Sequence, residues 1–149
     1  MALWGREAQE NDMLVSPLPV DVRHESERGS IEISYPGRHL IYYRLAGHID
    51  ASLVPGLVKP TLHAMALHGH IDEFIDCTRM TGYDSIVRVR MVEYLRAARE
   101  SGSVLQHVLV GTKIVTLGVW LAKLAAGGID IYHDRAAFEA ALGRALYPS

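Results

Sequence analysis

The chain has 149 residues, 49% of them hydrophobic, and a formal net charge of −2 at pH 7. This length and apolar content suit one domain with a buried core, and a charge so close to neutral gives no indication of a nucleic-acid-binding surface. A single cysteine, Cys77, excludes an internal disulfide and suits a reducing compartment.

The first 29 residues differ from the rest because they show scattered charges and no sustained periodicity. We therefore expect residues 1–29 to form an N-terminal tail and residues 30–149 to form the domain. Within the tail, Met13-Leu14-Val15 offers a short apolar segment that can dock on the domain. Charges interrupt the apolar run that a signal peptide needs, and the longest apolar stretch, 114–126, is shorter than the roughly 20 residues of a membrane span. We expect a cytoplasmic protein without a transmembrane segment.

In chain order, the first predicted elements are two strands. Apolar and polar residues alternate over 31–35 (IEISY), which predicts a half-buried strand. Pro36-Gly37 is a turn signal, and 39–46 (HLIYYRLA) predicts the second strand of a hairpin.

A helix is predicted next. Asp50 is a candidate N-cap for a helix over 51–67, and Gly69 is a natural stop. Pro60 lies inside this segment and is expected to kink or divide the helix, because proline lacks the N–H that a helix interior uses.

Strands and helices then alternate to the end of the chain. Residues 70–77 (HIDEFIDC) predict a strand, and a loop over 78–83 leads to Asp84-Ser85 at the start of a helix. The remaining predicted elements are a helix over 86–100, a strand over 104–110, a helix over 113–126, a strand over 129–132 and a helix over 135–146 that Asp134 caps. The order β-β-α-β-α-β-α-β-α indicates an α/β fold with a mixed, mostly parallel sheet and an antiparallel hairpin at one edge.

Four local features carry a resemblance to a known family. Gly47-His48-Ile49-Asp50-Ala51 looks like an entry into a first helix, and Phe74-Ile75-Asp76 looks like a strand end with an aspartate. Asp84-Ser85 opens the next helix eight positions later, and 131–141 looks like a last strand and helix. In this order the features resemble the STAS family, named for sulfate transporters and anti-sigma factor antagonists. The resemblance covers residues 31–146 and implies a single STAS-like domain with its helices mainly on one face of the sheet.

The resemblance implies a role for Ser85. In the antagonists a partner kinase phosphorylates the matching serine, so Ser85 is a candidate phosphorylation site. A phosphate adds roughly −1.5 to −2 charges, is tolerated at a helix N-terminus and repels a docked partner. The antagonists usually have Asp-Ser-Ser-Gly or Asp-Ser-Thr-Gly where this chain has Asp84-Ser85-Ile86-Val87. Plain helix capping by Asp84 or Ser85 is the alternative.

Other residues are expected to border the same partner-binding surface. They are Asp50, Met80, Tyr83, Asp84 and Arg88. An exposed Met80 or Tyr83 would suit an interface anchor, although one of them can instead turn inward and fill the core. Arg88 belongs to a basic helix face with Arg90, Arg96 and Arg99. That face either meets an acidic partner or is solvated beside Glu93 and Glu100.

The helix over 113–126 is apolar on more than one face. Its expected core stripe consists of Ile114, Leu117, Leu121 and Leu124. Val115, Val119 and Trp120 lie off this stripe and form a candidate apolar surface. That surface can be covered by the N-terminal tail, by a second copy in a homodimer, by a partner or by lipid, and we favour the tail or self-association.

No group of residues predicts a metal, a cofactor or a catalytic mechanism. His63 and His68 are five positions apart, which does not place them on one helical face, and no further ligand completes a set. Asp50, Asp76 and Asp84 can meet near the strand ends but have no base or metal partner. Phosphate-loop, dinucleotide and nucleophile-elbow motifs are absent from the sequence. We therefore expect a binding protein and not an enzyme.

Two functions stay open at this stage. The first is a regulatory module that binds an anti-sigma factor or a switch kinase through Asp84-Ser85. The second is a non-switching relative that holds a small apolar ligand or lipid near the helix over 113–126, or that assembles as a dimeric subunit.

Overall fold

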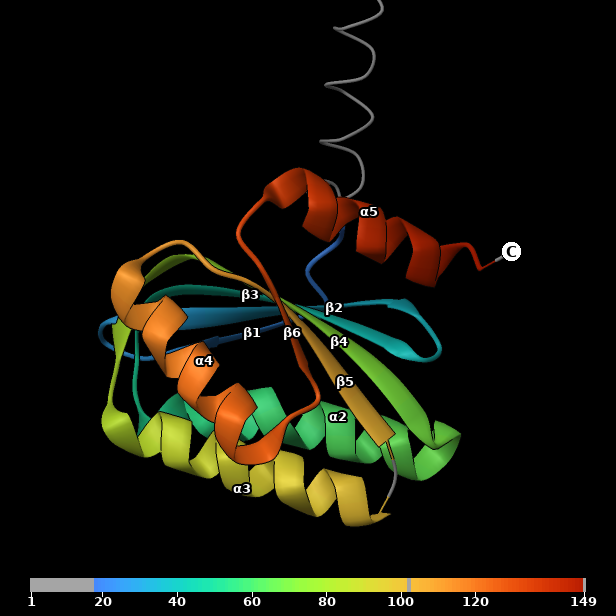
Figure 1. The fold of residues 1–149 in the computed structure, drawn as a ribbon, viewed down its shortest axis with the longest axis horizontal. Helices are drawn as coiled ribbons and strands as arrows, with labels where there is room; N and C mark the ends of the chain where they lie inside the picture. The colour runs from blue at the N-terminus through green and yellow to red at the C-terminus, as the bar shows by residue number, and fades with distance from the viewer. Residues whose placement is uncertain (1–17, 102, 149) are drawn as a thin grey trace, which may run out of the picture.

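A six-stranded sheet with helices on both faces forms the body of the protein (Figure 1). The computed structural model describes residues 18–101 and 103–148. The strands are β1 (Val22–Glu25), β2 (Gly29–Gly37), β3 (Leu40–Ile49), β4 (His70–Tyr83), β5 (Ser103–Leu109) and β6 (Ile129–Tyr132). The helices are the short 3-10 helix η1 (Ala51–Leu53), α2 (Val54–His68), α3 (Ser85–Ser101), α4 (Lys113–Ala126) and α5 (Arg135–Leu146).

The sheet follows the chain, with spatial order β1-β2-β3-β4-β5-β6. β1, β2 and β3 pair antiparallel, and β3 to β6 pair in parallel through the crossover helices α2, α3 and α4. These three helices cover one face, and α5 lies alone on the other (Figure 1). The predicted mixed sheet, with its antiparallel edge and its helices mainly on one face, is confirmed. None of the described helices is long and apolar enough to cross a membrane.

Two strands differ from the sequence-based prediction. β1 lies within the segment predicted as a tail, where it pairs with β2 and Val22 faces Ile33 in the register. Its four side chains are all exposed, so its sequence lacks the alternation of buried apolar and exposed polar residues from which a strand is predicted. β4 continues to Tyr83 where a loop over 78–83 was predicted, because the end of β3 pairs with it as far as Ile49. The predicted docking of Met13-Leu14-Val15 lies outside the described residues.

α2 runs as one helix through Pro60, so of the two predicted effects of this proline, a kink or a division, the division is wrong. Leu57, Thr61 and Met65 are buried at helical spacing on both sides of the proline. Packing of this stripe on the sheet compensates for the hydrogen bond that Pro60 cannot donate. The predicted stop is confirmed, since Gly69 ends the helix with a φ of 84°.

α5 covers the opposite face through a small aromatic and aliphatic core. Asp134 caps the helix by accepting a hydrogen bond from the Ala136 amide at 3.2 Å. Phe138 and Leu142 are fully buried against Tyr42 and Phe74 of the sheet. Each such side chain contributes about 1.5–3 kcal/mol through burial, which is enough to hold one amphipathic helix in place.

A buried carboxyl group lies between the sheet and the three helices. Glu73 of β4 is fully buried and accepts hydrogen bonds from the Thr61 hydroxyl at 2.6 Å, the Gln106 amide at 2.8 Å and the Tyr94 hydroxyl at 3.3 Å. Tyr43 extends this network through a 2.9 Å hydrogen bond to Thr61. Burial raises the pKa of Glu73 above its ordinary value of 4.5, although the three donors oppose that rise.

The raised pKa predicts how stability depends on pH. The folded protein holds a proton on Glu73 more tightly than the unfolded chain does, so this group destabilises the fold as pH rises from about 4.5 through the raised pKa. Glu73→Gln keeps the size and can still donate to Thr61 and accept from Gln106. We expect this variant to lose that pH-dependent decrease, as measured by urea unfolding between pH 4 and pH 8.

The exposed Glu93 on α3 provides the matched control, because Glu93→Gln removes the same charge outside the core. Glu73→Ala leaves three donors unsatisfied and is expected to cost about 1–3 kcal/mol at any pH in this range. A Glu73→Gln protein with the same pH profile as the wild type would contradict the assignment.

Candidate functional site

The end of β3 is shaped by close contact between two glycines. Gly29 and Gly47 face each other across β2 and β3, and a Cβ on Gly29 would overlap the His48 carbonyl, while one on Gly47 would overlap the Arg28 carbonyl. Gly47 also has a φ of 74°, a conformation that side chains other than glycine rarely adopt. A register shift between Gly47 and His48 follows on the β4 side. This local geometry directs His48 toward the start of α3.

His48, Asp84 and Arg28 form a polar cluster at this end of the sheet. The His48 Nε2 atom lies 2.7 Å from the Asp84 carboxylate, and the Arg28 guanidinium lies 3.9 Å from the same oxygen. Gly82 makes room for the His48 ring, since a Cβ there would lie 3.3 Å from Nδ1. Asp84 therefore bonds to His48 and does not cap α3 with its side chain.

Asp50 lies near the same arginine but has a structural partner of its own. As predicted, it is an N-cap, and its carboxylate accepts a hydrogen bond from the Ser52 amide at 3.0 Å at the start of η1. The pKa of Asp50 is lowered chiefly by its hydrogen bond from the Ser52 hydroxyl, and the positive charge of Arg28 contributes to the shift. The structure thus brings Asp50 and Asp84 together around Arg28.

Asp76 does not join this group, so the three aspartates do not converge. It is buried on the α5 side of the sheet, where its carboxylate accepts a hydrogen bond from Arg135 at 3.0 Å and another from the Thr78 amide at 2.9 Å. This ion pair fastens the first turn of α5 to β4, which is a structural role.

Ser85 is the first residue of α3 and its side chain is exposed. Within the described residues its hydroxyl has no hydrogen-bond partner, so the capping alternative for Ser85 is not what the structure shows. Two exposed apolar residues, Ile86 and Val89, lie in the same helical turns. A hydroxyl at a helix N-terminus beside apolar surface can accept a phosphate without disturbing the fold.

Two of the residues expected on this surface turn inward. Met80 is 6% exposed and belongs to the main core, so of the two alternatives for this residue the structure shows the inward one, and Met80 is not an exposed anchor. Its side chain points to the helix-covered face because a register shift between Asp76 and Arg79 inserts one extra residue into β4, and this reverses the face on which the following side chains lie. Tyr83 is half-buried and packs against the same core.

Arg88 also differs from the predicted basic helix face. It is half-buried and lines a cavity, whereas Arg90 is exposed. Arg96 donates to the Ala125 carbonyl at 3.0 Å, and the Arg99 guanidinium packs beside Gly127 at the end of α4. Cations at this end of a helix stabilise its last carbonyls. The four arginines therefore have separate surroundings and do not form one patch.

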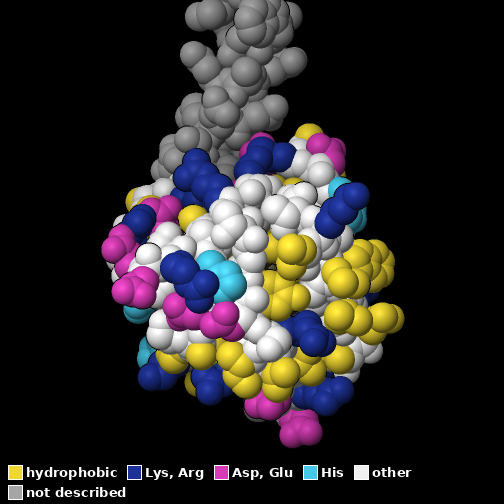
Figure 2. Space-filling model, turned by 90° about the vertical axis from the view of Figure 1, so that its left-hand side faces the viewer, with side chains coloured by type: hydrophobic (Ala, Val, Ile, Leu, Met, Phe, Trp, Pro, Cys, Tyr) yellow, Lys and Arg dark blue, Asp and Glu magenta, His cyan; other side chains and the backbone are white. Residues whose placement is uncertain are grey.

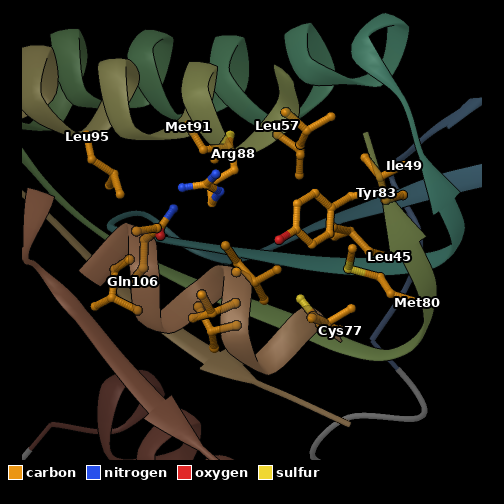
Figure 3. Close-up of a pocket in the computed structure, with 18 residues that line it drawn as sticks. Leu45, Ile49, Leu57, Cys77, Met80, Tyr83, Arg88, Met91, Leu95 and Gln106 are labelled. Atoms are coloured by element: carbon orange, nitrogen blue, oxygen red, sulfur yellow. The ribbon is translucent and has the colours of Figure 1, made fainter. Parts of the chain in front are cut away.

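The cavity lies between the sheet and the inner sides of α2, α3 and α4, and has a volume of about 100 Å³ (Figure 3). Almost all of its wall is apolar, including Leu57, Met91 and Leu95 from the helices. The polar groups that point into it in Figure 3 are the Tyr83 hydroxyl, the Arg88 guanidinium and the Gln106 amide.

α4 presents to the core a face different from the one predicted. Val115 is 2% exposed, and Gly118, Ala122 and Ala126 are buried beside it. Large residues form the outer face, with Ile114 66% exposed. The other exposed apolar residues of this face are Leu117, Trp120, Leu121 and Leu124.

The predicted core stripe of Ile114, Leu117, Leu121 and Leu124 is therefore wrong, and of the candidate apolar surface only Trp120 is exposed. Small side chains face the sheet because Tyr83 occupies the space opposite Gly118, so that large residues are left outside. Figure 2 faces the end where α3 and α4 begin, and hydrophobic side chains gather on it near a histidine that lies among charged side chains.

The other chemically capable residues have structural surroundings. Burial raises the pKa of the Cys77 thiol, which suits a core residue and not a reactive one. Among residues 18–101 and 103–148, no three histidine, cysteine or acidic side chains form a group that could hold a metal ion. His48 and Arg28 were not among the predicted site residues. One feature of the sequence could have identified His48 as a site residue. It lies between Gly47 and Asp50 at the end of β3, and the neighbouring strand β4 leads to Asp84.

The fold and these surfaces can be compared with known proteins. No protein-family model matches the chain, and no curated protein matches its sequence. Among solved structures, the anti-sigma factor antagonist SpoIIAA in its unphosphorylated form is 15% identical with a TM-score of 0.51, over 76% of this chain and 96% of that one. The Bacillus cell fate determinant SpoIIAA in its phosphorylated form is 12% identical with a TM-score of 0.53, over 74% of this chain and 98% of that one.

A third similar structure is an uncharacterized DUF3478 family protein with a SpoIIAA-like fold from Shewanella loihica. It is 13% identical with a TM-score of 0.52, over 80% of this chain and 97% of that one. The protein therefore has a STAS/SpoIIAA-like fold, as the resemblance predicts. At these identities the likeness establishes the fold alone.

The contact between Tyr83 and α4 can be tested with a double-mutant cycle. Gly118→Ala places a methyl group on the Tyr83 hydroxyl, so we expect a loss of about 1–3 kcal/mol in unfolding free energy. In a Tyr83→Ala background the same change should instead stabilise α4 by up to about 1 kcal/mol, because alanine favours helices over glycine. Denaturant unfolding of the four proteins measures the coupling.

Gly143→Ala in α5 is the control, since a Cβ there meets nothing within 4 Å. It should be neutral or stabilising in both backgrounds. Equal effects of Gly118→Ala with and without Tyr83 would mean that the tyrosine does not occupy the space beside α4.

Proposed function

We propose that this protein is a regulatory binding module that engages a signalling protein through the N-terminal end of α3, and that phosphorylation of Ser85 weakens this contact. The observation that carries the proposal is the exposed, unbonded Ser85 hydroxyl at the first residue of α3, on a fold shared with an anti-sigma factor antagonist. The partner class is an anti-sigma factor or a switch kinase, and the protein acts in the cytoplasm by binding and not by catalysis.

The surface around Ser85 has the composition of an interface. Ile86 and Val89 are 41% and 45% exposed, and they supply apolar contact area beside the hydroxyl. The His48–Asp84 pair and Arg28 lie next to this area and supply charges that can orient a partner. An apolar centre with a charged border is the usual arrangement of a protein interface.

Phosphorylation would act on this surface through charge and solvation. A phosphate on Ser85 would be stabilised by the free N–H groups of the first turn of α3, so the domain itself would stay folded. A partner that packs against Ile86 would have to bury that phosphate, and burying an unpaired charge costs several kcal/mol. The two antagonist structures were determined in unphosphorylated and phosphorylated forms, which supports such a switch in proteins of this fold.

Ser85→Asp is the direct test, because it adds a negative charge at the site with little change in size. Wild type, Ser85→Asp and Ser85→Ala would each capture proteins from a lysate of the source organism, with quantification by mass spectrometry. We expect a partner that the wild type and Ser85→Ala retain and that Ser85→Asp loses by at least tenfold.

Ala136→Asp is the matched control, since it adds the same charge in the first turn of α5 on the other face of the sheet. It should capture the same proteins as the wild type. Circular dichroism melting should show both aspartate variants folded. If Ser85→Asp and Ala136→Asp retain every partner equally, the surface around Ser85 is not the binding site.

A further inference from the structure

The cavity under α4 has an unusual combination of apolar walls and a single charge. Its lining includes Leu45, Ile75, Val108 and Ile129 from the sheet and no aspartate or glutamate, while Arg88 is its one charged residue among the described part of the chain. Glu73 is an acidic residue outside the lining, and it accepts a hydrogen bond from Gln106, which belongs to the lining. Burial raises the pKa of Glu73 and so favours its neutral form.

The volume of the cavity exceeds what ordinary core packing leaves. Protein interiors contain few voids larger than a water molecule, and a dry apolar cavity of about 150 Å³ holds benzene. A cavity of about 100 Å³ therefore has room for roughly four carbon atoms. Gly118 and Ala122 of α4 are among the residues that line it.

The polar groups at the cavity define what its occupant must carry. Arg88 has no hydrogen bond or ion pair with any residue from 18–101 or 103–148, and its guanidinium points toward the cavity beside Gln106 (Figure 3). The Tyr83 hydroxyl also points inward and is a second donor (Figure 3). Both residues are half-buried. A guanidinium without an acidic partner matches a carboxylate, with which it forms two parallel hydrogen bonds.

We propose that this cavity binds a short-chain carboxylate of about five carbons, with roughly four of them inside and the carboxylate on Arg88. The apolar walls take up the chain through the hydrophobic effect, and Arg88 supplies the selectivity for an anion over a neutral molecule of the same length. This binding function goes beyond the partner surface at Ser85 and does not depend on it.

Pentanoate, with pentan-1-ol as its uncharged analogue, tests the proposal in solution. Titration into the ¹⁵N-labelled full chain, followed by amide chemical shifts, measures millimolar as well as tighter binding. We expect saturable pentanoate binding at least tenfold tighter than that of pentan-1-ol, because a charge-assisted hydrogen bond adds about this much. The shifted amides should belong to α3, α4 and β5 around the cavity.

Two arginine variants separate the cavity from general charge effects. Arg88→Gln should weaken pentanoate at least tenfold and leave pentan-1-ol unchanged, whereas Arg90→Gln on the exposed side of the same helix should bind both like the wild type. A chain-length series from acetate to octanoate should give the tightest binding near five or six carbons. The proposal is overturned if pentanoate does not saturate, if it binds no better than pentan-1-ol, or if Arg88→Gln and Arg90→Gln behave alike.

Discussion

β3 and β4 stay paired in parallel to their last residues, with Ile49 beside Tyr83, and both candidate sites begin where this pairing stops. The pairing continues through two register shifts because Gly29, Gly47 and Gly82 let the strands and the His48 ring come close. It places His48 within hydrogen-bond distance of Asp84 and fixes the direction in which α3 starts. A change that separates the two strand ends would displace the Ser85 surface together with Ile49 and Tyr83 of the cavity lining.

α4 illustrates how packing decides which face of an apolar helix is buried. Its spacing alone allows two apolar stripes, one of large residues and one of small residues. The half-buried Tyr83 ring fills the space between the sheet and the helix, so only a face with Gly118 and Ala122 can approach it. The large residues Ile114 and Leu124 are consequently left outside, at 66% and 79% exposure. Nothing in the sequence of α4 itself carries this information.

Much of the fold follows from the sequence because local and tertiary preferences agree along most of the chain. α4, β6 and α5 have the predicted bounds, and Asp134 caps α5 as expected. The disagreements occur where tertiary pairing overrides a local signal. β1 is an exposed edge strand without apolar alternation, and the second half of β4 contains Thr81-Gly82, which locally favours a loop.

The candidate sites were predictable to different degrees, because some of their features depend on neighbours in the chain and others on tertiary pairing. The position of Ser85 at the start of a helix is visible in the sequence, because it depends on neighbours in the chain. The partners of Asp84 and the cavity at Arg88 depend on which strands lie side by side, which a single sequence does not specify. Met80 shows the difference most clearly, since a register shift within β4, which depends on pairing with β3, decides the face on which its side chain lies.

The two proposed sites share the first turn of α3, and this closeness gives them a physical connection. Ser85 and Arg88 are three positions apart, so they are neighbours on the helix surface. A phosphate on Ser85 would attract the Arg88 guanidinium outward, away from a carboxylate in the cavity, because one guanidinium cannot pair fully with both anions. Coupling between two binding equilibria is reciprocal, so a carboxylate that holds Arg88 inward would in turn weaken its contact with the phosphate. If both sites operate, an arginine without an acidic partner is the residue through which occupancy of the cavity and the state of Ser85 affect each other.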